Sequence, residues 1–118
     1  MAVGRILVIA PELDMRRSLQ FVLEAEGYEV MPRPRIDFDG PPIGGQYDAT
    51  VIDHRALSGP HHRAIAYCEK RSPVVLLSSR PIPWLTDHVA RHVEKPVAGD
   101  AVVAAVRSVI KKKPPHHH

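Results

Sequence analysis

Short runs of apolar, largely β-branched residues recur along the chain and are separated by polar or amphipathic stretches. The runs are Arg5 to Ile9, Tyr28 to Pro32, Ala49 to Ile52 and Pro73 to Leu77, with a shorter one at His92 to Lys95. Runs that are apolar almost throughout are typical of strands covered on both faces of a parallel sheet. The pattern therefore predicts five strands.

Helical periodicity appears between the first two strands and again near the C-terminus. In the first stretch, the apolar positions on the helical period are Met15, Leu19, Val22 and Leu23. Gly27 then provides the left-handed cap that commonly ends a helix. The last helix has its apolar positions at Val102, Ala105, Val106 and Val109. Asp100 lies in its first turn, where the helix dipole favours a negative charge. Strands that alternate with helices predict an α/β fold with a parallel sheet.

Two connections show little helical signal. Residues 32–46 contain four prolines and three glycines, which predicts an irregular segment or a single short helical turn. The stretch "GPPIGG" within it lacks the Gly-Lys-Ser/Thr ending of a phosphate-binding loop. Residues 78–91 begin with "SSRPIP", so a helix there is expected to start near Pro83 or Trp84.

The composition fits one globular domain, predicted at residues 1–110, followed by a basic tail at 111–118. The chain has 118 residues and a formal net charge of +3. The three lysines of the tail account for this excess, since the rest has 13 basic and 13 acidic residues. A neutral body does not favour nucleic acid as a partner. His116 to His118 have the form of a purification-tag remnant, and no function is predicted for them.

The sequence favours a cytoplasmic protein. No apolar run reaches the roughly 18 residues of a membrane span, and the apolar stretch at the N-terminus is too short for a signal-peptide core. The single cysteine, Cys68, cannot form an internal disulfide, which fits a reducing compartment.

Three polar residues close successive predicted strands. Asp53 ends the third strand, Ser78 the fourth and Lys95 the fifth. In an open parallel sheet, ligands bind outside the carboxyl ends of the strands. These three side chains are therefore expected to converge on one pocket, although aspartate is also common as a plain strand-end or turn residue.

The order of "ILVIAPELDMRR", "YDATVIDHR", "PVVLLSSR" and "VEKPV" resembles the receiver domain of bacterial two-component response regulators over residues 4–110. The resemblance implies a flavodoxin-like, doubly wound sheet of five parallel strands in the order 2-1-3-4-5. It also implies that Asp53 accepts a phosphoryl group, that Ser78 binds the phosphoryl oxygen and switches position, and that Lys95 neutralises the incoming charge. Pro96 would follow Lys95 through a cis bond. The implied partner is a sensor histidine kinase or a phosphotransfer protein.

The chain departs from the family where the family binds Mg²⁺. Two acidic residues normally follow the first strand, but here the positions are Ala10 and Pro11, which offer no carboxylate to a hard cation. Glu12, one position further on, is the remaining candidate ligand beside Asp53. Two positions after Asp53, where the backbone carbonyl normally helps to bind the metal, the residue is Arg55. At the position of the family's aromatic switch residue stands His92. Mg²⁺ binding is therefore expected to be weakened, and no other cofactor is implied.

Two functional hypotheses follow. In the first, phosphorylation of Asp53 changes the face formed by the family's fourth helix, fifth strand and fifth helix, which receivers use for partners or homodimers. In the second, that face acts constitutively as a protein-interaction module while Arg55 or Lys95 pairs with Asp53. An enzyme of another kind would need a nucleophile with a positioned base, and neither Cys68 nor Ser78 has an evident one. The sequence therefore does not favour an enzyme.

The histidines and the tryptophan leave alternatives open. His88 and His92 are four residues apart, as paired metal ligands on a helix would be, but no third ligand is evident and no native metal site is expected. His61 and His62 are adjacent and do not face the same way on a helix or strand. Trp84 fits either the centre of an interface or a packed position beneath the fourth helix.

Overall fold

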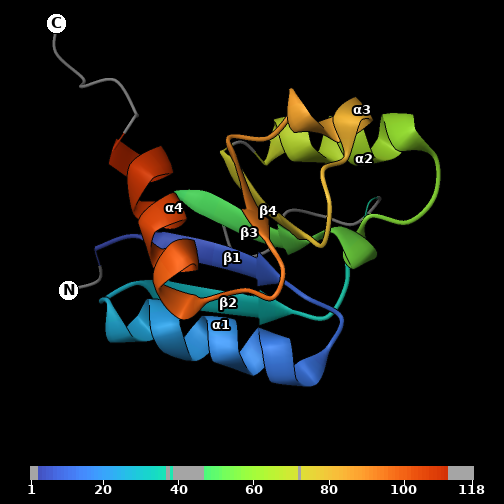
Figure 1. Ribbon diagram of the computed structural model, residues 1–118. Coiled ribbons are helices and arrows are strands. Elements are labelled where there is room, and N and C mark those ends of the chain that lie inside the picture. The colour runs from blue at the N-terminus through green and yellow to red at the C-terminus, as the bar shows by residue number, and fades with distance from the viewer. Residues whose placement is uncertain (1–2, 37, 39–46, 72, 112–118) are drawn as a thin grey trace, which may run out of the picture.

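Five parallel strands form the central layer of the protein (Figure 1). The structure is a computed structural model that describes residues 3–36, 38, 47–71 and 73–111. Within these ranges the strands are β1 (Arg5–Ile9), β2 (Glu29–Arg33), β3 (Ala49–Asp53), β4 (Val74–Ser78) and β5 (Arg91–Glu94). Their order across the sheet is β2-β1-β3-β4-β5, and each neighbouring pair is parallel. The predicted doubly wound, flavodoxin-like order is confirmed.

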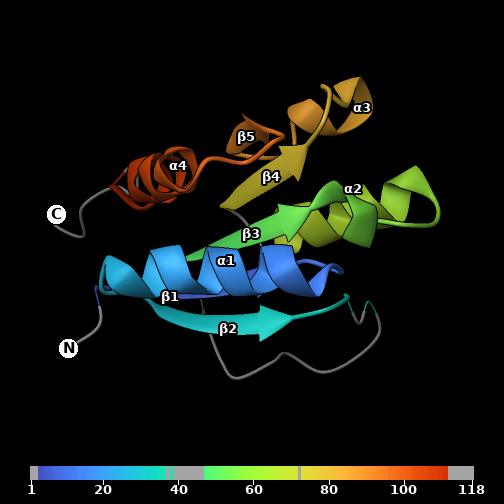
Figure 2. The ribbon, with the colours of Figure 1, turned by 60° about the horizontal axis from the view of Figure 1, so that its bottom comes forward.

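Helices cover both faces of this sheet (Figure 2). They are α1 (Leu13–Ala25), α2 (His61–Lys70), the short α3 (Pro83–Thr86) and α4 (Gly99–Lys111). Helices α1 and α4 pack on one face, and α2 and α3 pack on the other. Strand β1 shows why both faces are apolar, because its side chains alternate: Ile6 and Val8 join the core under α1 and α4, while Leu7 joins the core under α2 and α3. No helix in the described ranges is long and apolar enough to span a membrane.

Gly27 ends α1 as predicted and turns the chain into β2. Its φ angle is 96°, in the left-handed region where a side chain would be strained. The Gly27 N–H donates to the carbonyl of Glu24 at 3.0 Å, and the Tyr28 N–H donates to the carbonyl of Leu23 at 3.2 Å. These bonds satisfy the last carbonyls of the helix and place the next residue at the start of β2.

The predicted strands are confirmed with ends that move by about one residue, which is the usual uncertainty of strand and helix boundaries. Asp53 and Ser78 are the last residues of β3 and β4, and Lys95 directly follows β5. The helix after β4 begins at Pro83, also as predicted. The prediction for the Pro- and Gly-rich connection lies largely at residues 37 and 39–46, and most of the tail is at 112–118, both outside the described residues.

Candidate functional site

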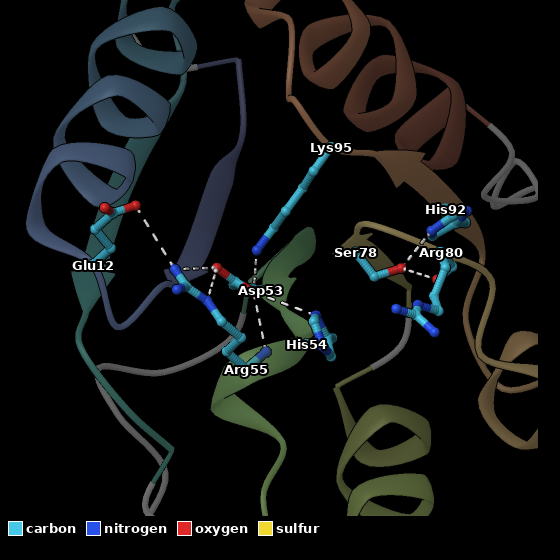
Figure 3. A network of polar contacts seen from close by, with 8 residues as sticks. All are labelled: Glu12, Asp53, His54, Arg55, Ser78, Arg80, His92 and Lys95. Atoms are coloured by element: carbon cyan, nitrogen blue, oxygen red, sulfur yellow. Dashed lines mark hydrogen bonds and ion pairs between the residues drawn. The ribbon is translucent and has the colours of Figure 1, made fainter.

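Asp53 lies at the carboxyl end of β3, in the middle of a network of cations (Figure 3). Its side chain is 0% exposed. The Oδ1 atom accepts hydrogen bonds from Lys95 Nζ at 2.9 Å and from the backbone N–H of Arg55 at 3.0 Å. The Oδ2 atom accepts from Arg55 Nε at 3.4 Å and from Arg55 Nη2 at 3.3 Å. Both carboxylate oxygens are therefore engaged.

The local chain path explains why Arg55 folds back onto Asp53. Asp53 is the N-cap of a short 3₁₀ helix, His54–Ala56, and its carboxylate accepts the N–H of Arg55. A cap of this kind satisfies a backbone donor that the helix itself leaves unpaired. It also fixes the backbone of Arg55, so that the guanidinium reaches the second carboxylate oxygen. Lys95 arrives from the end of β5, and the Lys95–Pro96 bond is cis, as the resemblance implied.

The surroundings of Asp53 act on its pKa in opposite directions. Burial is the largest influence and by itself raises the pKa of Asp53. The hydrogen bond from the Arg55 N–H and the hydrogen bond and charge of Lys95 lower it, with a further contribution from the Arg55 guanidinium. The balance leaves the pKa of Asp53 below its ordinary value, so the carboxylate is ionised at neutral pH.

Arg55 also connects Asp53 to the loop after β1. Its Nη2 atom lies 3.7 Å from Glu12 Oε1. The Arg55 and Glu12 side chains are 48% and 57% exposed, so water screens this ion pair and its strength is small. His54 Nδ1 lies 3.7 Å from Asp53 Oδ1, too far for a hydrogen bond, and has no hydrogen-bond partner among the described residues.

Ser78 belongs to a second polar group, separate from the cations around Asp53 (Figure 3). Its hydroxyl donates to the backbone carbonyl of Arg80 at 2.7 Å and lies 2.6 Å from His92 Nε2. Because a hydroxyl has one hydrogen, which is directed at Arg80, the His92 Nε2 atom acts as the donor to Ser78 in this arrangement. The structure thus brings Asp53 and Lys95 into direct contact. The hydroxyl of Ser78 instead contacts His92 on β5 and the backbone of Arg80 in the loop after β4, and Arg80 was not predicted as a partner.

The loop after β1 does not fit a magnesium ion. Ala10 is fully buried in the core under α1 and α4, and its neighbour Pro11 carries no oxygen on its side chain. Arg16 Nη1 donates to the carbonyl oxygens of Ala10 and Pro11, at 2.9 Å and 3.3 Å, so these backbone oxygens are also occupied. Mg²⁺ requires near-octahedral oxygen coordination. Within the described ranges, no three His, Cys, Asp or Glu residues lie together as a metal site would require.

Trp84, His61 and His88 have local partners in the described structure, and Trp84 packs partly buried against the core under α2 and α3. The His61 ring stacks on Trp84 with a centroid distance of 3.7 Å and an interplanar angle of 5°. His88 Nδ1 lies 2.7 Å from Glu69 Oε2, whereas His92 bonds Ser78, so the two histidines at helical spacing have different partners. No sequence pattern predicted these partners, or the role of Arg16, because each depends on the direction of a side chain and not on spacing alone.

The fold of the chain is that of the receiver domains of response regulators, which confirms the fold implied by the sequence resemblance. Full-length FixJ from B. japonicum matches with a TM-score of 0.79 and 22% identity over 98% of this chain and 61% of that chain. The non-phosphorylated HemR receiver domain from Leptospira biflexa matches with a TM-score of 0.74 and 20% identity, covering 96% of this chain and 98% of that one. The receiver domain of the Francisella response regulator 1452 matches with a TM-score of 0.76 and 17% identity, covering 94% and 99%.

The likeness is one of fold rather than of close sequence. The chain spans 61% of the length of full-length FixJ. No protein-family model matches the sequence, and no curated protein matches it either.

Proposed function

We propose that this chain is a receiver-type signalling domain that acts through protein contacts without phosphorylation. The observation that supports this function best is the closed state of Asp53, whose two oxygens accept bonds from Arg55 and Lys95 while the side chain is fully buried. A carboxylate in this state is neutralised by the protein itself. The role is that of a signalling module rather than an enzyme, and we place it in the cytoplasm.

Phosphoryl transfer is disfavoured because the residues around Asp53 do not fit the metal ion that would offset the charge of its transition state. Metal ions that bridge the phosphoryl oxygens are a recurring part of such reactions. Here Ala10 and Pro11 supply no side-chain ligands, and the guanidinium of Arg55 contacts Oδ2 of the buried Asp53. For Oδ2 to attack a phosphoryl donor, Arg55 would first have to leave it.

The proposed contact surface is the face formed by α3, β5 and α4. These elements correspond to the family's fourth helix, fifth strand and fifth helix. Strand β5 is an edge strand, and its residues Arg91, His92 and Glu94 are exposed. Arg91 Nε donates to Ser108 Oγ at 3.0 Å, which ties the edge of the sheet to α4. An exposed, charged edge joined to a helix gives a fixed surface that a protein partner, or a second copy of the chain, can contact.

A phosphorylated receiver is the second candidate function. It is favoured by the 2.9 Å contact of Lys95 with Asp53 and by the cis Lys95–Pro96 bond, the arrangement that the resemblance implies for a working phosphoacceptor. In that case a sensor histidine kinase or a phosphotransfer protein would be the donor, and Ser78 and His92 would have to exchange their present contacts during activation.

The two functions are separated by intact-mass measurement after incubation with acetyl phosphate, with Mg²⁺ or with EDTA. We expect no gain in mass, for the wild type as for an Asp53→Ala control. NMR amide shifts near Asp53 should likewise not respond to Mg²⁺. A gain of one phosphoryl group that Asp53→Ala abolishes would refute the constitutive function and establish the second candidate.

A further inference from the structure

The exposed apolar residues of the described chain gather on and beside α1. The large hydrophobic side chains with high exposure are Phe21 at 73%, Val3 at 63% and Leu13 at 47%. Leu13 and Phe21 lie on α1, at its start and near its middle. Val3 lies at the other end of α1, because its N–H donates to the carbonyl of Gly27 at 3.0 Å. Figure 2 shows α1 at the front of the molecule, with no other described element over its outer side.

The outer side of α1 has a symmetrical order of charge and apolar groups. Four exposed residues follow each other along α1 at spacings of four, four and three, so they form one stripe of the helix. They are Leu13, Arg17, Phe21 and Glu24. Neither Arg17 nor Glu24 has an ion-pair partner among the described residues, although Glu24 accepts a hydrogen bond from Gln20 Nε2 at 3.1 Å. A cation lies on one side of the stripe's centre and an anion on the other.

This order becomes complementary when two copies of α1 lie antiparallel. With the axis between Gln20 and Phe21, Arg17 of each copy faces Glu24 of the other, about 5 Å from the axis at 1.5 Å per residue. Leu13 of each copy faces the far end of the partner helix, where Val3 is exposed. The two Phe21 rings meet at the centre. One arrangement thus pairs both free charges and covers all three exposed apolar side chains.

The surface beside Phe21 leaves room for a second aromatic ring. Between α1 and α4 there is an open hollow of about 440 Å³. Its apolar lining comes from Phe21, Val22 and Ala25 on α1 and from Val103 and Ala104 on α4, and the charged residues Glu26, Asp100 and Arg107 also line it. The Phe21 ring of a second copy can therefore lie against apolar side chains next to the first.

We propose that this chain forms a two-fold symmetric homodimer through the outer stripe of α1, with Arg17 and Glu24 as reciprocal ion pairs around Phe21. A two-fold contact of this kind uses the same patch on both copies. The contact area of two such helices is small, so the dimer is a weak, concentration-dependent one. It differs from the α3–β5–α4 face and does not depend on whether Asp53 is phosphorylated.

The test is a charge-reversal cycle followed by sedimentation velocity over about 10 μM to about 1 mM protein. Arg17→Glu alone and Glu24→Arg alone each place like charges across the axis, and each should weaken the dimer on the order of tenfold. The double variant, Arg17→Glu with Glu24→Arg, restores both pairs and should return the dimer to wild-type strength. Phe21→Ala should also weaken it. These side chains are exposed, so circular dichroism melts should show that every variant folds.

Lys70→Glu is the matched control, because it makes the same charge reversal on the exposed part of α2, across the sheet from α1. It should leave the dimer unchanged. The proposal is overturned if the wild type stays monomeric over the whole concentration range. The stripe on α1 would then be a contact surface for a different protein. The proposal is also overturned if neither single reversal weakens the dimer, if the double variant does not restore it, or if Lys70→Glu weakens it equally.

Discussion

Replacing Lys95 by methionine removes the ammonium that lies 2.9 Å from Asp53 Oδ1 while keeping much of the bulk of the side chain. The Asp53 side chain is 0% exposed and that of Lys95 15%, so water cannot fully replace the lost contact. Removing one partner of a buried ion pair costs about 3–5 kcal/mol of unfolding free energy. Since Arg55 still contacts the other oxygen, we expect the lower end of that range, about 3 kcal/mol.

Arg55→Met is the matched comparison, because it removes the other cation from the same carboxylate. The Arg55 side chain is 48% exposed, and its backbone N–H continues to donate to Oδ1 in the variant. Solvent screening should therefore limit the loss to about 1 kcal/mol or less. The contrast between the two variants isolates the effect of burial.

Urea unfolding followed by circular dichroism measures both losses. With a slope of about 1–3 kcal/mol per molar urea, a loss of about 3 kcal/mol lowers the midpoint by at least about 1 M. Adding Asp53→Asn to Lys95→Met removes the buried negative charge that Lys95 no longer offsets and should recover part of the loss. If Arg55→Met costs as much as Lys95→Met, or if Asp53→Asn recovers nothing, the buried Asp53–Lys95 pair is not what stabilises the site.

Three further outcomes follow from the structure. The pKa of Asp53 is lowered in the folded state, so its carboxylate adds stability above the ordinary aspartate value of about 3.9. This contribution is lost as the pH falls through the folded pKa. In urea titrations between about pH 6 and pH 2, the wild type should therefore lose more unfolding free energy than Asp53→Asn. Pro11→Asp combined with Arg55→Ala adds a carboxylate beside Glu12 and releases Oδ2 of Asp53, so Mg²⁺ should raise the melting temperature of this variant and not that of the wild type. Cys68 is buried and its pKa is raised to about 11, so a thiol reagent at neutral pH should modify it only as fast as the protein opens, and rapid modification of the folded protein would contradict its placement.

The sequence predicts the fold well where the signal is a run of residues and less well where it is the direction of one side chain. The strand at Arg5 to Ile9 is apolar on both faces, and the sheet accordingly has helices on both faces. The proximity of Asp53 and Lys95 follows from the rule that strand ends share one edge. The strand order came from the resemblance, since spacing alone does not fix which strands are neighbours.

Contacts that depend on side-chain direction lay beyond the sequence. Ser78 closes β4 as expected, but its hydroxyl can turn towards several neighbours, and in the structure it bonds Arg80 and His92. The bonds from Arg16 to the carbonyls of Ala10 and Pro11 likewise depend on how the first turn of α1 is oriented over the loop. Neither arrangement has a periodic pattern that a sequence could display.

The charges around Asp53 balance among the protein's own side chains. Two carboxylates, those of Asp53 and Glu12, face two cations, those of Arg55 and Lys95. The group is therefore formally neutral as it stands. An acidic residue in place of Ala10 or Pro11 would make this group negative, and a divalent cation would then be needed to balance it. A phosphoryl group on Asp53, with a charge of about −1.5 to −2 at neutral pH, would leave an excess of negative charge that no residue of the described site offsets. The absence of carboxylates at Ala10 and Pro11 and the presence of Arg55 are thus two parts of one arrangement, in which the group of charges around Asp53 is neutral as it stands.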